Sequence, residues 1–331
     1  MNQSLLNHLT MKAAVRYQYC PPQQLSVGEV PQPQPKANEI LVRVYATTVN
    51  RTDCALLTGW PLAIRAFTGF RKPKLPITGT DFAGQVEGIG QEVKDFKIGD
   101  RVWGFDDTGL ESHAQYLCIA TSGNVIKMPE NASYEEAAAS AEAAHYAINF
   151  VNKLQVSPGQ KVLVNGGTGA IGSAAIQILH DLGVQVTAVC GTKNVERIQS
   201  FGVEKVIDFE KEDFTQQGES YDYVFDAVGK STFFKCKGIL KPGGIYLSSE
   251  LGPWWQNLYL PLITRIFGSK KVVFPIPFNV KASLEYMKKL VEAGQFKPLI
   301  DRTYPLEKIS EAFEYVGSGQ KIGNVIIDLA D

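Results

Sequence analysis

The sequence predicts an α/β protein in which a doubly wound parallel sheet is inserted into a β-rich domain built from both chain ends. Three observations support this prediction: short β-rich runs up to about residue 128, alternating strands and helices after it, and β-rich sequence again at the C-terminus. A chain of 331 residues is long enough for two domains. We therefore expect an N-terminal extension over 1–10, a β-rich domain over 11–128 and 279–331, and a parallel-sheet domain over 129–278.

The first part of the chain contains short segments with strand character, separated by proline and glycine. The segments are "MKAAVRY", "EILVRVYAT", "FAGQVEGIG" and "YLCIA", and the separating runs include "PQPQPKANE" and "KIGD". From Ser133 the pattern changes to an alanine-rich run, "SYEEAAASAEAAHYAINFVNKL", which predicts helix. Ser133 and Glu136 have the spacing of a capping box at its start.

The middle of the chain alternates between strands and helices. The expected strands are "KVLVNG", "QVTAVC", "KVIDF", "YDYVFDAVG", "GIYLSS" and "KKVVFPI", and the expected helices span 169–182, 195–201 and 231–240. Such alternation is typical of a parallel sheet with helices on both faces. A last helix is expected over 281–293, with Leu284, Met287, Leu290 and Val291 on one face, before a final strand in "KIGNVIIDLA".

Composition limits the classes of function. Lysine and arginine number 33 against 34 acidic residues, so the net charge of -1 gives no overall attraction for nucleic acid or anionic membrane. Five scattered cysteines argue against a disulfide framework and favour a reducing compartment, so we expect a cytoplasmic protein. The start, "MNQSLLNHLT", does not read as a signal peptide, and no apolar run reaches the roughly 18 residues of a membrane span.

A glycine-rich turn stands in "VLVNGGTGAIGSAAIQIL", residues 162–179. Gly167, Gly169 and Gly172 match GxGxxG after an expected strand and at the start of an expected helix, which is the context that a dinucleotide site requires. Gly167 permits the tight turn, Gly169 lets the backbone approach a pyrophosphate, and Gly172 lets the helix pack on the strand. The helix N-terminus then faces the phosphates. We predict a bound dinucleotide here, with a ligand-free turn as the alternative; the loop also contains Thr168, Ala170 and Ile171.

The end of the next strand predicts which dinucleotide binds. An NAD site usually has an acidic residue about 20 residues after the glycines, for the ribose hydroxyls. Here the strand ends in "AVCGTKNVER", where Thr192 and Lys193 occupy the tip and no acid does. A hydroxyl and a cation suit a 2′-phosphate, so NADPH is expected in preference to NADH. The alternative is that Lys193 and Arg197 are ordinary surface residues at a helix start.

Several motifs together resemble a known family. They are, in order, "TTVNRTDCALLTG", "LPITGTDFAGQVEGIGQEVKDFKIGDRVWG", "VLVNGGTGAIGSAAIQI", "YDYVFDAVG", "GILKPGGIYL" and "KIGNVII". The chain resembles the medium-chain dehydrogenase/reductase superfamily from Met11 onward, and most of all its quinone oxidoreductase-like members. This resemblance implies a GroES-like catalytic domain with an inserted Rossmann domain, and an active site in the cleft between them.

The same resemblance argues against catalytic zinc. The positions that hold zinc in the alcohol dehydrogenases of this superfamily match Asn50, Thr80 and Ser140 here, and none of these is a good zinc ligand. His113 and Cys118 could in principle share a metal, but a lone surface histidine is the simpler interpretation. Alcohol–ketone interconversion needs a Lewis acid, whereas hydride addition to an electrophilic acceptor needs much less. We therefore expect a zinc-independent, NADPH-dependent oxidoreductase that reduces a quinone or an α,β-unsaturated carbonyl.

The resemblance also implies which side chains lie near the cofactor. Asn50 is implied to lie near the nicotinamide ribose, and Asp53 either touches ligand or anchors the loop. Further contacts are expected at the carboxyl ends of the later strands, where ligands of open α/β sheets bind; these are Val228, Gly229 and Ser248, with Phe274 and Asn324 as weaker family-based contacts. No residue is identified from the sequence as the catalytic proton donor.

Two aromatic-rich loop segments, 56–76 and 252–268, are expected to form the pocket for a flat apolar acceptor. The expected pocket residues are Trp60, Phe67, Trp103, Trp254 and Trp255. Core packing, a dimer interface and contact with a membrane surface are the alternatives for these aromatics.

Two other functions remain open at this point. The basic and aromatic run at 65–74 could hold RNA or a protein partner while the Rossmann domain senses NADPH without turnover. A zinc alcohol dehydrogenase with unusual ligands is the other. Under the preferred function we expect a small-molecule quinone or enone as substrate and no nucleic acid. A homodimer is also expected, with "KKVVFPI" extending a sheet across a two-fold axis as in relatives.

Overall fold

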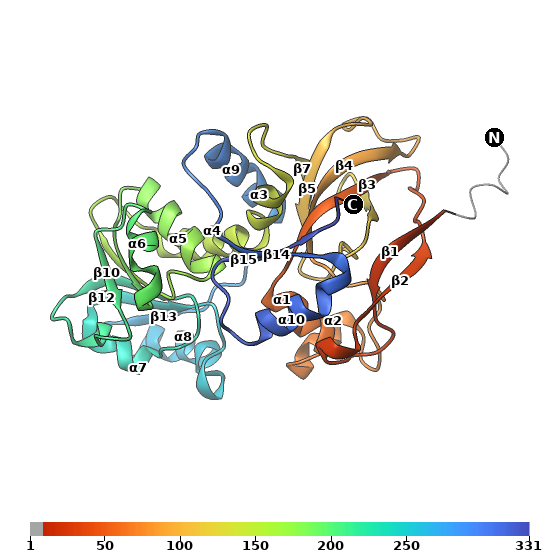
Figure 1. The fold of residues 1–331 in the computed structure, drawn as a ribbon. Coiled ribbons are helices and arrows are strands. Elements are labelled where there is room, and N and C mark those ends of the chain that lie inside the picture. The colour runs from red at the N-terminus through yellow and green to blue at the C-terminus, as the bar shows by residue number, and fades with distance from the viewer. Residues whose placement is uncertain (1–8, 331) are drawn as a thin grey trace. The chain divides into compact units, whose positions relative to one another are not determined.

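The computed structural model describes residues 9–330, so most of the expected extension over 1–10 lies outside the described residues. The chain forms two compact units, one up to Glu142 and from Val280 onward, and the other over Ala143–Asn279 (Figure 1). We refer to them as unit 1 and unit 2. The predicted class is confirmed, because unit 1 is rich in antiparallel sheet and unit 2 contains a parallel sheet flanked by helices.

Unit 1 is built on a seven-stranded sheet in the order β14-β15-β3-β4-β5-β7, with β6 paired to β3. Its strands are β3 (Glu39–Val49), β4 (Asp81–Ile89), β5 (Arg101–Phe105), β6 (Tyr116–Ala120), β7 (Val125–Lys127), β14 (Ile300–Pro305) and β15 (Asn324–Asp328), and β1 (Thr10–Val15) pairs with β2 (Ser26–Pro31) in a separate ribbon. The C-terminal strand β15 pairs antiparallel with β3, Val325 opposite Val49. This pairing joins the two chain ends in one domain.

The helices of unit 1 follow local sequence signals. They are α1 (Arg51–Thr58), α2 (Arg65–Thr68), α3 (Tyr134–Ala139), α9 (Val280–Glu292) and α10 (Ile309–Gly317). The predicted capping box of Ser133 and Glu136 is present at the start of α3, and α9 buries the predicted face that includes Leu284 and Met287. These helix starts and faces are therefore confirmed.

The first boundary between the units lies at Glu142, whereas the sequence suggested residue 128. The alanine-rich run is two helices, α3 and α4 (Glu142–Leu154), with a break at Ser140. The side chains of Ala137, Ala138 and Ala139 are buried, and helix α3 packs on β3, β4 and β15. Small side chains let this helix approach the sheet closely, so it belongs to unit 1.

Unit 2 contains a six-stranded sheet in the order β10-β9-β8-β11-β12-β13, with every pair parallel. The strands are β8 (Lys161–Asn165), β9 (Gln185–Cys190), β10 (Lys205–Asp208), β11 (Tyr221–Asp226), β12 (Leu240–Ser248) and β13 (Lys271–Val273). The strand order reverses between β8 and β11, and ligands of such sheets bind outside the carboxyl ends at this switch point.

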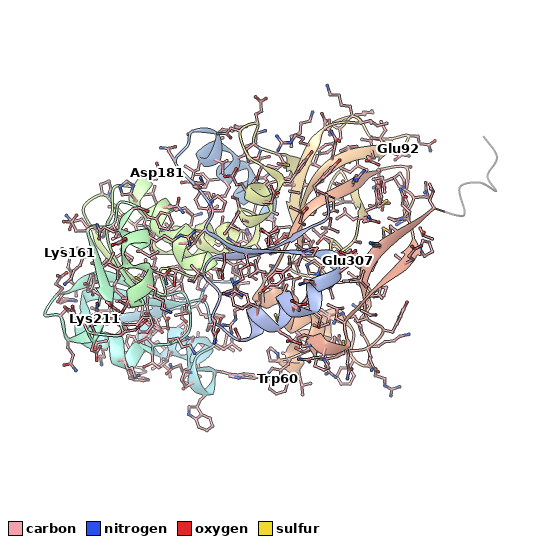
Figure 2. The ribbon with its side chains drawn as sticks, viewed as in Figure 1. Trp60, Glu92, Lys161, Asp181, Lys211 and Glu307 are labelled. Carbon is pink, nitrogen blue, oxygen red and sulfur yellow. The ribbon has the colours of Figure 1, made fainter. Side chains whose placement is uncertain are left out.

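The helices of unit 2 are α4, α5 (Ala170–Asp181), α6 (Val195–Gln199), α7 (Phe233–Cys236) and α8 (Gln256–Ile266). Helix α5 leads from the glycine turn to Asp181, which Figure 2 labels. The expected loop over 252–268 is wrong, because most of this segment is α8. Its residues Leu260 and Thr264 are one turn apart, so the helical conformation places both on the face that packs against β13.

Candidate functional site

The glycine turn, which we call the glycine cradle, connects β8 to α5 and ends at the N-terminus of the helix. A Cβ added to Gly172 would lie 2.2 Å from the backbone oxygen of Gly166, so only glycine fits there. A Cβ on Gly169 would meet that oxygen at 3.4 Å, which is ordinary contact. The protein's own packing therefore does not require glycine at 169. A close approach of an anion to the backbone would explain a glycine here, since the first amide groups of a helix lack partners within the helix.

Hydrogen bonds connect the central strands β8, β11 and β12 beside the glycine cradle. The Asp226 carboxylate at the end of β11 accepts hydrogen bonds from Asn165 Nδ2 (3.0 Å), from the Ser231 amide (2.9 Å) and from the Tyr246 hydroxyl (3.2 Å). This network was not predicted from the sequence, although polar residues ending two buried strands were a signal for it. It fixes the edge where Val228, Gly229 and the buried Ser248 lie.

Val228 lies directly over the glycine turn. A Cβ added to Gly166 would be 2.3 Å from Val228 Cγ1, and Gly166 itself has a φ of 86°. Gly229 follows with a φ of 64°, a region that favours glycine. The structure thus brings the predicted residues Gly167 to Gly172, Val228, Gly229 and Ser248 to the carboxyl edge of one sheet.

The tip of β9 carries more negative charge than the sequence suggested. The Thr192 hydroxyl donates to Asp208 Oδ2 at 2.7 Å, and the Thr192 amide donates to Glu210 Oε1 at 3.3 Å. Asp208 ends β10, where it pairs with Cys190 in the parallel register, and Glu210 follows two residues later. Lys211 Nζ lies 3.0 Å from Asp208 Oδ2. The Thr192 hydroxyl, with help from Lys211, lowers the pKa of the Asp208 carboxyl. Lys193 is exposed at the same tip.

Asn50 begins helix α1 in unit 1. Its side-chain oxygen accepts from the Asp53 amide (2.8 Å), and the Asp53 carboxylate accepts from the Asn50 amide (3.1 Å), which is a complete capping box. Asn50 Nδ2 also donates to the Thr80 hydroxyl at 2.8 Å. Burial, and next the charge of Asp81, raise the pKa of Asp53 well above its usual value. Asp53 therefore anchors the loop, while contact of Asn50 with a nicotinamide ribose stays a prediction.

His113 is completely buried, so the interpretation of a lone surface histidine is wrong. Its Nδ1 lies 2.8 Å from the Thr78 hydroxyl, and its Nε2 lies 2.8 Å from the Thr48 carbonyl oxygen. Burial lowers the pKa of His113 to about 4, so the ring is neutral at pH 7. Pairing of the surrounding strands buries His113, and no local sequence pattern predicts that burial.

The residues at the zinc positions do not fit a zinc ion. Asn50 and Thr80 are hydrogen-bonded to each other, and the Ser140 hydroxyl donates to the Glu136 carbonyl oxygen at 2.6 Å. An amide and two hydroxyls are not the nitrogen, sulfur or carboxylate donors that zinc prefers. Within residues 9–330, no three or more His, Cys, Asp or Glu side chains are grouped so that they could hold a metal ion.

Glu142 is a titratable residue that was not predicted from the sequence. The Thr52 hydroxyl of α1 donates to Glu142 Oε1 at 2.9 Å. Burial, followed by the charges of Asp107 and Asp81, raises the pKa of Glu142 to about 8. An acidic residue between alanines, in "AAASAEAA", was the available signal.

The predicted pocket aromatics lie in different environments. Trp103 is fully buried in β5, whereas Trp60, Phe67, Trp254 and Trp255 are exposed. Phe274 is half-buried after β13, and Asn324 is buried in β15, where its Nδ2 donates to the Leu299 carbonyl oxygen at 3.1 Å. Trp254, Trp255 and Phe274 belong to unit 2 with the glycine turn, whereas Trp60, Phe67, Trp103 and Asn324 belong to unit 1.

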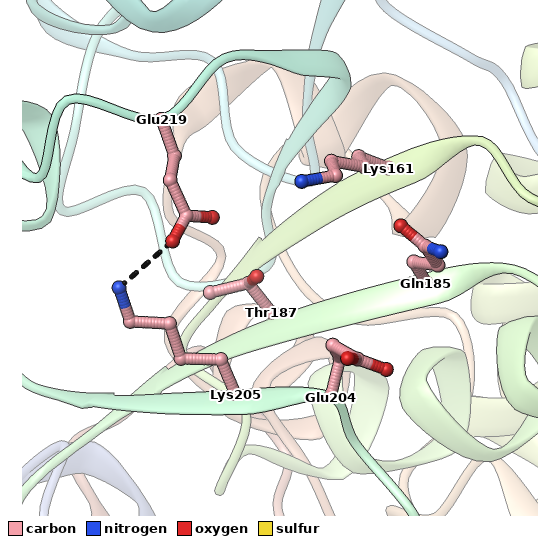
Figure 3. A pocket seen from close by; sticks show the side chains of 6 residues that line it. All are labelled: Lys161, Gln185, Thr187, Glu204, Lys205 and Glu219. Atoms are coloured by element: carbon pink, nitrogen blue, oxygen red, sulfur yellow. Dashed lines mark hydrogen bonds and ion pairs between the residues drawn. The ribbon is translucent and has the colours of Figure 1, made fainter.

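A charged pocket of about 290 Å³ lies at the opposite edge of the sheet (Figure 3). Its lining residues come mainly from the starts of β8, β9 and β10, and they are Lys161, Gln185, Thr187, Glu204, Lys205 and Glu219. Lys205 and Glu219 form an ion pair of 3.0 Å across it. Amino ends of parallel strands face away from the carboxyl edge, so this pocket is separate from the glycine cradle.

Comparisons with known proteins agree with this architecture. An alcohol dehydrogenase GroES-like domain family matches residues 36–149, and a zinc-binding dehydrogenase family matches 201–327. The chain is 30% identical over 313 residues to the chloroplast envelope quinone oxidoreductase homolog of Arabidopsis thaliana, covering 91% of this chain and 92% of that protein. It is 30% identical over 316 residues to 2-methylene-furan-3-one reductase of Solanum lycopersicum, covering 91% and 74%.

Among solved structures, the quinone oxidoreductase from Coxiella burnetii superposes with a TM-score of 0.84 at 26% identity, covering 97% of this chain and 100% of that one. The chain therefore belongs to the medium-chain dehydrogenase/reductase superfamily of oxidoreductases, among its quinone oxidoreductase-like members.

Proposed function

We propose that this protein is an NADPH-dependent, zinc-independent reductase that transfers hydride to a quinone or an α,β-unsaturated carbonyl. The observation that carries the proposal is the glycine cradle at the switch point of the parallel sheet, where the protein's own packing does not require Gly169 and an anion could approach the backbone. The donor set at the zinc positions supports a reaction without a metal. The names of the two relatives at 30% identity, a quinone oxidoreductase homolog and a furanone reductase, support the class of acceptor.

The chain's own residues would bind and orient the cofactor. The amide groups at the start of α5 bind the pyrophosphate, and Val228 and Gly229 line the path from the cradle along the carboxyl edge. Asn50 positions the ribose on the nicotinamide side. A bound nicotinamide dinucleotide supplies the hydride, and the protein contributes binding, orientation and exclusion of water.

The charges at the tip of β9 support a modest preference for NADPH. Lys193 favours a 2′-phosphate, whereas Glu210, whose carboxylate accepts from the Thr192 amide, favours a ribose hydroxyl. The charge of Lys211 is balanced by its ion pair with Asp208. We therefore propose that Glu210 limits the selectivity that Lys193 provides.

Titration calorimetry of the apo-protein with NADPH and NADH tests the cofactor, and loss of NADPH absorbance with a panel of quinones and enones tests the reaction. NADPH binding at least about tenfold tighter than NADH, a difference of about 1.4 kcal/mol, together with turnover of a panel member, is the expected result. Binding of NADPH without turnover of any acceptor would contradict the reductase and favour a protein that senses NADPH.

We further propose a cytoplasmic homodimer. Strand β13 is an edge of the six-stranded sheet, so its unpaired side can pair with the same strand of a second copy. Light scattering during gel filtration tests this assembly, and the mass of a single chain would contradict it.

A further inference from the structure

Helix α8 presents an apolar stripe to solvent. The stripe residues are spaced three and four apart, and their exposed fractions run from 45% to 74%; they are Trp255, Leu258, Tyr259, Leu262, Ile263 and Ile266. Trp254, at 93% exposed, precedes the stripe. The opposite side of the helix is buried, and there the Thr264 hydroxyl accepts from the Val272 amide at 3.0 Å. A surface helix normally turns polar residues to water, so the outer face of α8 has the character of a binding surface.

The turn before α8 holds the two tryptophans outward. Trp254 and Trp255 have φ angles of 53° and 56°, a left-handed conformation that bulky side chains rarely adopt. Asn257 secures the turn, because its Nδ2 donates to the Glu250 carbonyl oxygen at 2.7 Å and its amide donates to the Leu251 carbonyl oxygen at 3.0 Å. Backbone strain of this kind persists where the surrounding structure imposes it, and it often marks a functional site.

The charge around the stripe indicates the chemistry of its partner. About one residue in ten of the chain is acidic, yet no Asp or Glu occurs from Leu251 to Asn279. Arg265 is exposed on α8 and Lys271 is exposed at the start of β13, while Lys270 Nζ donates to the Lys237 carbonyl oxygen at 2.6 Å. A partner with an apolar layer beneath an anionic layer matches both features, and tryptophan and tyrosine favour such interfaces.

We propose that the outer face of α8 docks this protein on the surface of an anionic lipid bilayer. The apolar stripe would enter the boundary between headgroups and acyl chains, with Arg265 and Lys271 close to lipid phosphates. The 11 residues of α8 extend about 16 Å, so the helix lies along the surface. None of the helices within residues 9–330 is both long and apolar enough to cross a membrane.

A segment of unit 1, residues 54–80, also combines exposed aromatic and apolar side chains with basic residues and no acidic residue. Trp60, Leu62, Phe67 and Phe70 are between 59% and 81% exposed, and Trp60 is labelled in Figure 2. No acidic residue occurs from Cys54 to Thr80, while Arg71 and Lys72 are exposed within that run. The segment is held from beneath, since the Tyr19 hydroxyl lies 2.8 Å from the Thr68 hydroxyl. An aromatic, basic and acid-free surface thus occurs independently in each unit.

Co-sedimentation of the full chain with vesicles tests the proposal. Vesicles of phosphatidylcholine are compared with vesicles that also contain about one quarter phosphatidylglycerol, at low and at physiological salt. We expect the protein to pellet with the anionic vesicles, and more weakly as salt rises. The double variant Leu262→Glu with Ile266→Glu should partition at least about tenfold less, because two apolar side chains become charged.

The matched control places glutamate at similarly exposed apolar positions elsewhere. Ile98 is 63% exposed and Phe234 is 64% exposed, and neither belongs to the α8 surface. The double variant Ile98→Glu with Phe234→Glu should bind vesicles as the native chain does. Circular dichroism spectra and urea unfolding midpoints close to those of the native chain should show that both double variants fold.

Failure of the native chain to pellet with anionic vesicles would overturn the proposal, as would equal binding by the α8 double variant. A native dimer that becomes monomeric in the α8 double variant, with no vesicle binding by either, would assign the surface to a second copy instead. The proposal does not depend on the reductase activity. A chain that binds vesicles but reduces no acceptor would keep the docking surface and contradict the proposed function.

Discussion

The fold does not require glycine at position 169, whereas the proposed cofactor site does. The variant Gly169→Ala therefore tests that site directly. The backbone there has φ -69° and ψ 160°, which alanine adopts without strain. The new Cβ would lie 3.4 Å from the Gly166 carbonyl oxygen and 3.8 Å from Val228 Cγ1, both ordinary contacts. We therefore expect the free energy of unfolding to fall by no more than about 1 kcal/mol, the usual scale of an N-cap change.

Cofactor binding should respond much more strongly. The methyl group would occupy the space through which a pyrophosphate approaches the backbone, and would remove at least one hydrogen bond to a charged group. Such a bond contributes about 1.5–3 kcal/mol, so the affinity for NADPH should drop about tenfold to 150-fold. Titration calorimetry measures this drop, and urea unfolding of the same samples measures stability.

Variants of two further glycines serve as controls for this experiment. A Cβ on Gly238 would meet no atom within 4 Å, so Gly238→Ala should leave cofactor binding unchanged. A Cβ on Gly172 would lie 2.2 Å from a backbone oxygen, so Gly172→Ala should destabilise the fold by more than about 2 kcal/mol. If Gly169→Ala binds NADPH as tightly as the native chain, the phosphates do not approach Gly169 and the turn serves only as scaffold.

Three more predictions concern charge, pH and metal. Lys193→Ala should weaken NADPH binding with little effect on NADH, and Glu210→Gln should raise the ratio of NADPH to NADH affinity; equal effects on both cofactors would place the 2′-phosphate elsewhere. Burial lowers the pKa of His113 from 6.5 to about 4, so between these values the unfolded chain binds more protons and native stability falls as pH falls. The excess unfolding free energy of the native chain over His113→Gln should therefore shrink by about 2 kcal/mol from pH 7 to pH 5, measured by urea unfolding, and a constant difference would contradict the neutral buried ring. Prolonged chelation should leave NADPH oxidation unchanged, and stoichiometric zinc by elemental analysis together with lost activity would refute the zinc-independent reaction.

Sequence reasoning succeeded where the signal is confined to one element or one turn. The alternation of strands and helices, the capping box of Ser133 and Glu136, and the buried face of α9 depend on residues within a few positions of one another. The glycine turn belongs to this group, because its strand–turn–helix context is local. The expected domain boundary at residue 128 differs from the unit boundary at Glu142, because α3 packs on a sheet whose strands come from both ends of the chain. No local pattern records that packing.

The sequence by itself determined the fold class and the position of the glycine turn, because these follow from periodicity and from steric demands within short segments, and the resemblance of its motifs indicated the family. Only the tertiary structure placed Asp208 and Glu210 beside Thr192, buried His113 among strands of unit 1, and turned the apolar stripe of α8 to solvent. The physical reason is that charge balance and exposure depend on which elements pack together. Strand pairing and sheet packing join residues that are far apart in the chain, and no local pattern records those neighbours.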